Sequence, residues 1–488
     1  MLRLSRAQFA RPFAVILGHP RPNGEYKMKL RFFGGVDTVT GSAHAVEVNG
    51  KQVLRDCGLY QGRRAEANRR NRSFAFDPQD LAAVVLSHAH IDHCGNLPSL
   101  AKAGYRGPIH TTTATVALCD VMLHDAAYIQ EQDAAYLNQK TNRRGLPPIE
   151  PLYTAADADR VLKLLRGYHY GEGIEVVPGA RLALLEAGHI LGAALTVFDL
   201  EENGRRVRLG FAFDLGRHGL PLIRDPAPMR DIDTLVIEST YGSRRHPAPA
   251  EAGAQLRDVV RRTIERGGKV LIPSFALERA QEVLYHLARL TADGEIEETP
   301  VYVDSPMASA VTRIFERSTP YLDEEFHALR ERIGRVITPS WVHFTASVEE
   351  SKQITASDRP CIVIAASGMC EYGRILHHLK HGITNPRNTI VLVGFQAAHT
   401  LGRRLYDGDP EVRIFGDLFE RKAEVVSLPA FSAHADREDL ATYVQDAAPR
   451  RVFLVHGESE ARSALAERLR EIKGLEVFLP EPGDAVEL

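Results

Sequence analysis

The sequence lacks any apolar run of the roughly 18 residues that a membrane-spanning helix needs, so we expect no transmembrane segment. Cysteine is scarce: five residues, an odd number without a CxxC pair, argue against a disulfide framework and favour a reduced, cytoplasmic setting. Neither sign of charge dominates, because 60 basic residues stand against 63 acidic ones. Nucleic acid could therefore be bound only through a local basic patch, and not through the field of the whole protein.

Two basic segments stand out from this balanced background. The denser one is GRRAEANRRNR at 62–72, for which a solvated loop is the simpler interpretation and a nucleic-acid contact the alternative. The other is residues 1–27, which hold several arginines and a single acid, Glu25. We expect an N-terminal extension there, either a disordered arm or a start placed too far upstream of Met28. A targeting peptide is the weaker alternative.

The order of expected strands and helices indicates more than one domain. A chain of 488 residues is too long for a single core, so two or three domains are expected. Short strands dominate up to about residue 235, with helical spacing of apolar residues at 114–137 and 155–166. From about 250 onward, buried strands such as KVLIPSF alternate with helices. That alternation is typical of a doubly wound parallel sheet, and the sequence contains no repeats.

The segment SHAHIDHCG at 87–95 carries the clearest chemical pattern. His88, His90, Asp92 and His93 follow directly on the apolar strand LAAVVL. Neutral imidazole and carboxylate are the ligands that zinc prefers where a position must stay open for water. His88 and His90 would project together toward one metal, and Asp92 and His93, beyond a bend, toward a second. A polar turn with chance histidines would not need this spacing, so we predict a metal site.

Three more candidate ligands follow apolar strands elsewhere in the chain. His189 lies in AGHILGA, Asp214 in GFAFDLG and His456 in VFLVHGE, each beside or near a glycine. Any one of them alone is equally well a structural turn residue or a loop cap. Their shared order of strand, ligand and glycine favours a common role in the metal site.

These motifs together resemble the metallo-β-lactamase fold, in the β-CASP branch of nucleic-acid nucleases. HAHIDHCG resembles the fold's signature, and Asp56 in RDCG its first motif. ESTYG (238–242), FSAHAD (431–436) and LVHGE (454–458) resemble the three further motifs of the branch. The resemblance implies an α/β chain: an αββα metallo-β-lactamase sandwich, split into 28–235 and 425–488, and an inserted doubly wound parallel-sheet β-CASP domain at 236–424. The active site would lie in the cleft between the two domains.

The resemblance also assigns roles to single residues. One zinc ion would be held by His88, His90 and His189, and a second by Asp92, His93 and His456, with Asp214 bridging both. Asp56 would orient the ligand loop from outside the metal shell. Two zinc ions would activate a water for attack on a phosphodiester, giving a 5′-phosphate and a 3′-hydroxyl. His434, held by Glu238, would protonate the leaving 3′ oxygen.

Substrate-binding residues are less clearly marked. SGMCEYGR at 367–374 follows a buried strand, so the amides of Ser367, Gly368 and Met369 would hold a phosphate, or the segment is only a tight turn. GFQAAHTLGRRL at 394–405 resembles part of the family's substrate domain. There Arg403 and Arg404 either contact the RNA backbone or are merely solvated.

The resemblance favours RNA over DNA as the substrate. Members that act on RNA have a histidine at the last motif, as His456 is here, whereas DNA-processing members tend to have an aliphatic residue. The chain ends soon after that motif and has no KH-type extension, so we expect a compact bacterial two-domain nuclease. It would act mainly on single-stranded RNA, in the cytoplasm, and a homodimer would be compatible with the family. A DNA nuclease, a small-molecule hydrolase on the same fold and an inactive RNA-binding scaffold are the alternatives.

Overall fold

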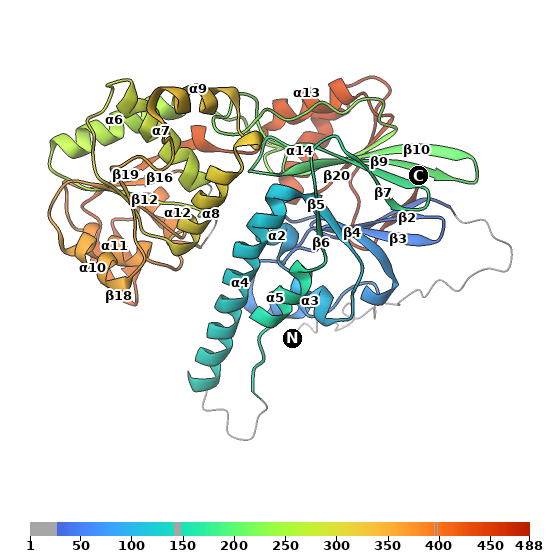
Figure 1. Cartoon of the computed structure of the whole chain (residues 1–488), viewed down its shortest axis with the longest axis horizontal. Helices are drawn as coiled ribbons and strands as arrows, with labels where there is room; N and C mark the ends of the chain where they lie inside the picture. Colours follow the sequence, from blue (N-terminus) through green and yellow to red (C-terminus); the bar gives the residue numbers. More distant parts are fainter. Residues whose placement is uncertain (1–26, 141–147, 395, 398) are drawn as a thin grey trace, which may run out of the picture.

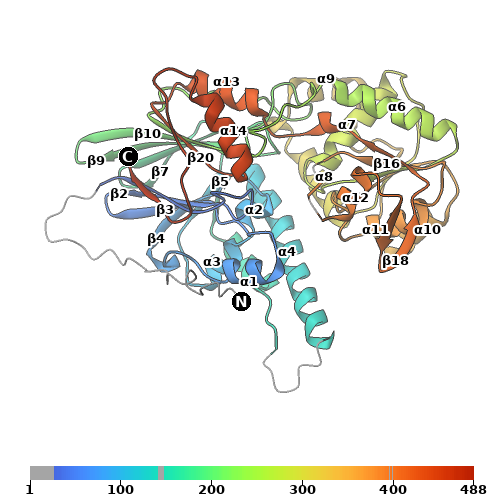
Figure 2. The same ribbon diagram turned by 180° about the vertical axis from the view of Figure 1, so that it is seen from behind.

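The computed structural model describes residues 27–140, 148–394, 396–397 and 399–488. The expected N-terminal extension falls almost entirely outside these residues. Two seven-stranded sheets pack face to face and form one half of the molecule, and a six-stranded sheet with its own helices forms the other half (Figures 1 and 2).

The first sheet contains both the first and the last strand of the described residues. Its strands, in spatial order, are β22 (Ala485–Glu487), β1 (Lys29–Gly34), β2 (Ala43–Val48), β3 (Lys51–Arg55), β4 (Leu81–Val85), β5 (Ile109–Thr112) and β6 (Leu165–Tyr168). The second sheet lies against it, in the order β21 (Glu476–Phe478), β20 (Arg451–Leu454), β11 (Thr234–Ile237), β10 (Arg205–Ala212), β9 (Ala194–Glu202), β8 (Ala180–Glu186) and β7 (Gly173–Val177).

An apolar core separates these two sheets. Alternate residues of their strands, such as Leu30, Val46, Phe198 and Phe211, are fully buried between them. Residues of the opposite parity face helices on the outer surfaces, as period-two alternation requires. The helices are α1 (Arg64–Asn71), α2 (Ile91–Cys94), α3 (Leu97–Lys102), α4 (Thr113–Lys140), α5 (Ala155–Leu162), α13 (Arg437–Ala447) and α14 (Ser459–Leu469). This arrangement is the expected αββα sandwich.

The third sheet is inserted between β11 and β20. Its strands, all paired in parallel, are β14 (Val342–Phe344), β13 (Val301–Val303), β15 (Ile362–Ala365), β12 (Val270–Pro273), β16 (Thr389–Leu392) and β19 (Glu424–Ser427). Because β11 and β20 pair directly, the sandwich is assembled from both ends of the chain. The domain limits at 236 and 424 remain a prediction, and β19 carries the third sheet to Ser427.

Helices cover both faces of the third sheet, so the doubly wound prediction is confirmed. Val270 and Ile272 of β12 face a core shared with one layer of helices, and Leu271 between them faces a separate core on the other side. The first layer is α6 (Glu251–Glu265), α7 (Arg279–Ala292), α8 (Pro306–Arg317) and α9 (Glu324–Ile333). The second is α10 (Val348–Ala356), α11 (Ile375–Gly382) and α12 (Leu401–Tyr406), beside the hairpin β17 (Glu411–Ile414) and β18 (Asp417–Glu420).

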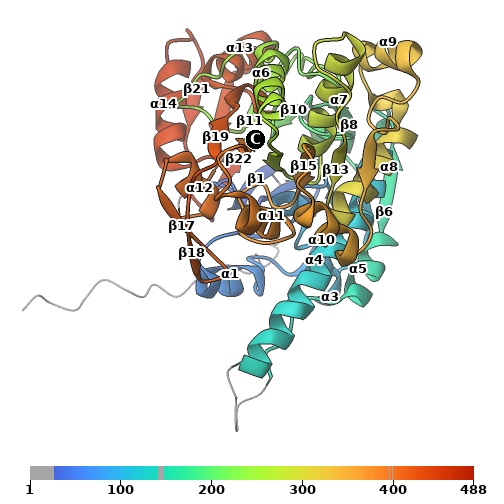
Figure 3. The same cartoon turned by 90° about the vertical axis from the view of Figure 1, so that its left-hand side faces the viewer.

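Helix α4 lies where the two halves meet and packs against α8 (Figures 1 and 3). It is longer than the expected helix over 114–137 and begins directly after β5. No helix of the described residues is long and apolar enough to cross a membrane.

Two sequence expectations in this half are corrected. The basic stretch at 62–72 contains a helix, α1, and not a loop. Its charges are partly compensated, because Arg70 pairs with Glu66 and Arg64 with Asp133. The helix expected over 155–166 ends at Leu162, since Leu165–Tyr168 joins the first sheet as β6.

Candidate metal centre

Three of the expected site residues have an unusual backbone conformation. Asp56, Asp214 and His456 follow β3, β10 and β20 within two residues and have φ angles of 61°, 47° and 49°. A left-handed conformation is uncommon for residues other than glycine, and such residues cluster at active sites. Each of these turns projects its side chain into one region at the strand ends.

The first group of candidate ligands contains three histidines and one carboxylate. His90 Nδ1 lies 3.1 Å from His88 Nε2 and 3.2 Å from His189 Nε2. Asp214 Oδ2 lies 3.2 Å from His88 Nε2 and 3.5 Å from His189 Nε2. Tetrahedral zinc with bonds of about 2.0–2.1 Å holds its ligand atoms roughly 3.4 Å apart. The spacing and the donor chemistry of these four side chains therefore fit a zinc ion.

The second group shares Asp214 with the first. Its Oδ2 lies 3.4 Å from His93 Nε2, and its Oδ1 lies 3.3 Å from His456 Nδ1. Asp92 Oδ2 lies 3.7 Å from both His93 Nε2 and His456 Nε2. With one ligand atom taken from each of the four residues, all four atoms lie within 4.8 Å of one another, as in the first group. Asp214 is thus placed where a carboxylate could bridge two metal ions.

The electrostatics of the cluster favour the metal-binding forms of His90, His189, Asp92 and Asp214. His93 is the exception, because burial would lower its pKa but Asp214, Asp56 and Asp92 raise it well above its usual value. Burial and His88 lower the pKa of His90 to about 3, and burial and His434 lower that of His189 well below its usual value. Burial alone would raise the pKa of Asp92 and of Asp214, but the neighbouring His93 holds both below the usual range. Neutral imidazoles and ionised carboxylates are the species that coordinate zinc.

Asp56 lies behind His93 and fixes its ring. Its Oδ2 accepts a hydrogen bond from His93 Nδ1 at 2.6 Å, which leaves Nε2 facing the candidate metal position. Ser87 donates from both its amide and its hydroxyl to the same carboxylate, at 2.8 and 2.9 Å. Burial would raise the pKa of Asp56, but the adjacent Arg55 and His93 lower it to about 2. The carboxylate therefore stays ionised and can orient the histidine.

His434 and Glu238 lie beside the shared carboxylate. His434 Nδ1 is 3.3 Å from both carboxylate oxygens of Glu238, and its ring lies 4.6 Å from that of His189. Glu238 also accepts a short hydrogen bond from the amide of Leu215, next to Asp214. Burial would lower the pKa of His434, but Glu238, Asp214 and Asp92 raise it to about 9. A histidine protonated at neutral pH is suited to act as a general acid.

The loop that carries His189 is held from both domains. Glu186 at the end of β8 accepts a hydrogen bond from the amide of Gly188 at 3.0 Å. Glu278, just before α7, accepts one from the amide of Leu191 at 2.9 Å. The loop also packs so tightly on Gly216 that a Cβ there would lie 1.7 Å from the carbonyl oxygen of Gly188.

Three regions of the chain match sequence profiles of known domains. Residues 36–173 match the metallo-β-lactamase superfamily, residues 280–405 the Beta-Casp domain, and residues 419–480 a Zn-dependent metallo-hydrolase RNA specificity domain. The chain is also 38% identical over 460 residues to Ribonuclease TTHA0252 of Thermus thermophilus, across 94% of this chain and the whole of that protein. This chain belongs to the metallo-β-lactamase superfamily, in its β-CASP branch. It is a metal-dependent hydrolase.

Further proteins are similar over most of the chain. Transcription termination factor FttA of Methanocaldococcus jannaschii is 31% identical over 484 residues, which cover 95% of this chain and 72% of that protein. A crystal structure of a protein of unknown function from Enterococcus faecalis matches with a TM-score of 0.53 at 13% identity, across 95% of this chain and all of that one. The latter likeness supports the fold alone.

Within the β-CASP domain, the loop after β15 only partly suits the expected phosphate contact. The amide of Ser367 donates to the carbonyl of Tyr372 at 3.1 Å, and the Ser367 hydroxyl accepts from the amide of Glu371 at 3.1 Å. Ser367 thus closes the turn with its own polar groups. Gly368 and Met369 remain the candidates for a phosphate contact.

Arg403 and Arg404 are both paired with acids of their own segment. Arg403 Nε lies 2.9 Å from both oxygens of Asp407, and Arg404 Nε lies 2.8 Å from Asp409 Oδ2. A phosphate would have to compete with these carboxylates. The backbone contact therefore stays a prediction, with solvation as its alternative.

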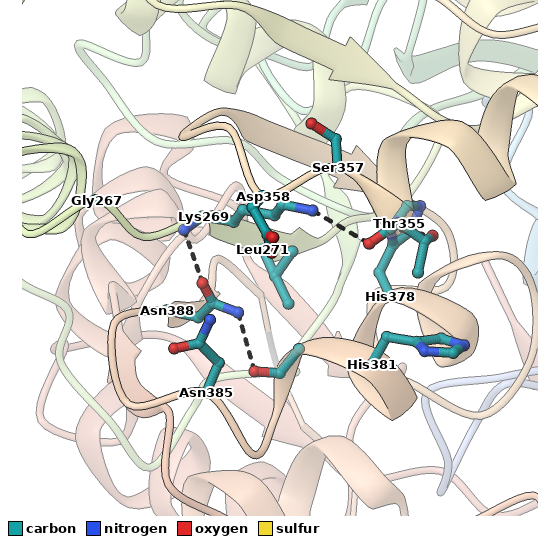
Figure 4. Close-up of a pocket in the computed structure, with 11 residues that line it drawn as sticks. Gly267, Lys269, Leu271, Thr355, Ser357, Asp358, His378, His381, Asn385 and Asn388 are labelled. Atoms are coloured by element: carbon teal, nitrogen blue, oxygen red, sulfur yellow. Dashed lines mark hydrogen bonds between the residues drawn. The ribbon is translucent and has the colours of Figure 1, made fainter.

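A small polar cavity of about 60 Å³ lies at the amino end of β12 in the third sheet (Figure 4). The loop after β15 lies at the opposite, carboxyl end of this sheet. At the cavity, Lys269 Nζ donates to the carbonyls of Ile354 and Thr355 near the end of α10, and Asn388 Nδ2 donates to Gly382 at the end of α11. These polar groups satisfy helix C-termini, so the cavity has a structural explanation.

Sequence reasoning missed three residues that support the candidate site. Arg55 is fully buried, with its guanidinium carbon 4.2 Å from the ring centre of Phe213 and its side chain paired with Asp56. The sequence signal for Arg55 is its position as a charged residue at the end of an apolar strand. Ser87 lies inside the histidine motif itself, whereas nothing local in the sequence marks Glu278, because its partner comes from the other domain.

Proposed function

We propose that this chain is a zinc-dependent ribonuclease that hydrolyses RNA phosphodiester bonds to 5′-phosphate and 3′-hydroxyl ends, in RNA processing or decay. The observation that carries the proposal is the pair of ligand groups joined through Asp214, with His434 beside them. The similarity to a ribonuclease along nearly the whole chain supports RNA as the substrate, as does the match of 419–480 to an RNA specificity domain.

We infer that His88, His90 and His189 hold one zinc ion and that Asp92, His93 and His456 hold a second, with Asp214 shared. Two zinc ions in these positions would supply a water activated at neutral pH and would neutralise phosphate charge. The protein's own residues orient the site: Asp56 fixes His93, and the loops after β8 and β10 bring His189 and Asp214 together.

His434 is the proposed general acid. Its Nδ1 is held by Glu238, so the proton on Nε2 is the one available to the leaving 3′ oxygen. The negative charge of Glu238 keeps the His434 ring protonated. Glu238 also orients the ring, because its own position is fixed by the amide of Leu215. General acids of this kind contribute about 10²- to 10⁴-fold to the rate.

The test compares a 5′-labelled single-stranded RNA with the matching DNA as substrates. We expect cleavage of RNA to products with 5′-phosphates, and its abolition in His90→Ala. His434→Ala should lower kcat by about 10²- to 10⁴-fold with the zinc content unchanged, and Glu238→Gln should have a smaller effect in the same direction. His381→Ala, on an exposed histidine of α11, is the matched control and should cleave normally.

The other outcomes assign other functions. Cleavage of DNA with RNA left intact would identify a DNA nuclease, and failure on both by the zinc-loaded protein would favour a small-molecule hydrolase. Product lengths distinguish endonucleolytic from 5′-exonucleolytic cutting. We also expect a homodimer, by family resemblance, which light scattering would test.

A further inference from the structure

Phe275 is an exposed aromatic side chain beside the carboxyl end of β12. It follows β12 by two residues, and 41% of its surface is accessible. The edge of its ring rests on two glycines: a Cβ on Gly368 would lie 3.0 Å from Cδ2 and Cε2, and one on Gly394 would lie 3.3 Å from Cε2. The absence of side chains at both positions makes room for the ring, which keeps part of its surface open to solvent.

The three residues belong to the carboxyl ends of three adjacent parallel strands. Phe275 follows β12, Gly368 follows β15 and Gly394 follows β16, and β12 lies between the other two. The chain builds β13, β14 and β15 on one side of β12 and then crosses to build β16 and β19 on the other. Ligands of open parallel sheets bind outside the carboxyl ends of the strands, at the position where the strand order reverses.

The turn that carries Phe275 is also fixed to the candidate metal centre. Glu278, three residues further on, accepts the hydrogen bond from Leu191 that holds the His189 loop. Three residues span at most about 11 Å, so the backbone of Phe275 lies within that distance of Glu278, which contacts a loop that carries a candidate zinc ligand. Glu278 is buried and has a φ of 69°, which defines the direction of the turn.

We propose that Phe275 is a stacking platform for one base of the RNA, at a nucleotide near the scissile phosphate. The inference rests on the proposed ribonuclease function, and it gives a physical reason for single-stranded RNA as the substrate. Every base has an aromatic face, so a single phenyl ring binds bases with little sequence preference. A base paired in a duplex cannot leave its stack without cost, so the platform selects single-stranded RNA. Phe275 would contact the base while the neighbouring Gly368–Met369 segment faces the backbone.

The test uses an RNA 12-mer with the fluorescent base 2-aminopurine placed at each position in turn. Binding is measured with the zinc-loaded His434→Ala protein, in which cleavage is slow. We expect quenching at one or two positions, and loss of that quenching in His434→Ala/Phe275→Ala. Affinity for the RNA should fall by about 5- to 100-fold, as for loss of one stacked base.

Further variants separate stacking from simple apolar contact. Phe275→Trp should keep both the quenching and the affinity, whereas Phe275→Leu should lose the quenching although it stays apolar. Phe415→Ala removes an aromatic that is 54% exposed on the β17–β18 turn, and should change neither quantity. Equal quenching in Phe275→Leu and the parent protein would overturn the stacking proposal.

The two proposals fail in distinguishable ways. If the protein with native His434 binds and cuts RNA and its Phe275→Ala variant does so equally well, the platform is wrong and the ribonuclease assignment stands. If the protein with native His434 neither binds nor cuts RNA, the ribonuclease assignment fails and the platform with it. Thermal unfolding of each variant, expected within about 1 °C of the parent because Phe275 lies outside the core, tests that the fold is intact.

Discussion

At the scale of single residues, the candidate site depends on side chains at left-handed backbone positions. Asp56, Asp214 and His456 each adopt such a conformation, which costs roughly 1–2 kcal/mol for an L-residue. The surrounding contacts offset that cost. Asp56 alone accepts hydrogen bonds from His93 and from two groups of Ser87, and pairs with Arg55.

We expect Asp56→Asn to weaken zinc binding by about 10- to 100-fold, because it removes the charge that orients His93. Competition with a chromophoric chelator measures the affinity. Asp77→Asn, which changes an acid that only caps a short 3₁₀ turn at 78–80, is the control and should bind zinc normally. Unchanged affinity in Asp56→Asn would mean that the carboxylate does not support the metal site.

At the scale of elements, local sequence identifies strand and helix but not always their limits. The stretch at 62–72 has charged residues all around the helix, so no apolar face marks α1. The segment at 165–168 has helical spacing in the sequence, yet pairing with β5 makes it a strand. In both cases contacts from elsewhere in the chain decide the conformation.

A buried acid between elements of the β-CASP domain gives a prediction at this scale. Asp304, after β13, accepts hydrogen bonds from Arg374 at 2.6 Å and His378 at 2.7 Å, and from Ser351 and Thr345. Burial would raise its pKa, but His378, Ser351 and the other donors lower it below the usual range. A carboxyl with a lowered pKa in the folded state stabilises the protein above its unfolded pKa, about 4, and loses that contribution as pH falls further.

Asp304→Asn should therefore lower the free energy of unfolding by about 3 kcal/mol at pH 7, by leaving Arg374 without its buried partner. The difference from wild type should persist at pH 5 and shrink below pH 4, where Asp304 becomes protonated in the unfolded chain while the folded state still holds it ionised. Urea unfolding followed by circular dichroism measures it. Asp417→Asn, at an exposed acid paired with Lys380, should change stability by less than about 1 kcal/mol at any pH. If Asp304→Asn lowered the free energy of unfolding equally at every pH, the ionised state assigned to Asp304 would be wrong.

At the scale of the whole molecule, the candidate ligands come from segments far apart in the chain. The first sheet contributes the histidine motif after β4, the second contributes His189 and Asp214, and the C-terminal segment contributes His456 after β20. Bound metal would therefore connect both sheets of the sandwich and both of its chain segments.

Removal of zinc should lower the melting temperature by several degrees, because a ligand at about 1,000 times its Kd stabilises the folded state by roughly 4 kcal/mol. Differential scanning calorimetry before and after treatment with a chelator measures the shift, and added zinc should reverse it. His90→Ala should show a smaller shift than wild type. Equal melting temperatures with and without chelator would argue against a structural contribution of the metal.

The sequence by itself determined the fold, the family and the candidate ligands. The signals for these are local: four potential ligands lie within residues 88–93, and His189, Asp214 and His456 each follow an apolar strand. Resemblance then assigned Glu238 and His434 together, and the structure brings them within 3.3 Å.

Only the tertiary structure decided which distant residues support that site. The hydrogen bond from Leu191 to Glu278, the burial of Arg55 against Phe213, and the position of Phe275 over two glycines all join residues that are remote in sequence or come from different strands. Such contacts leave no periodicity or motif in the chain, because they depend on how the two domains and three adjacent strand ends come together in space. The same reason explains why the sequence left open whether Arg403 and Arg404 contact RNA or are solvated, and why it did not show their pairing with Asp407 and Asp409 in the fold.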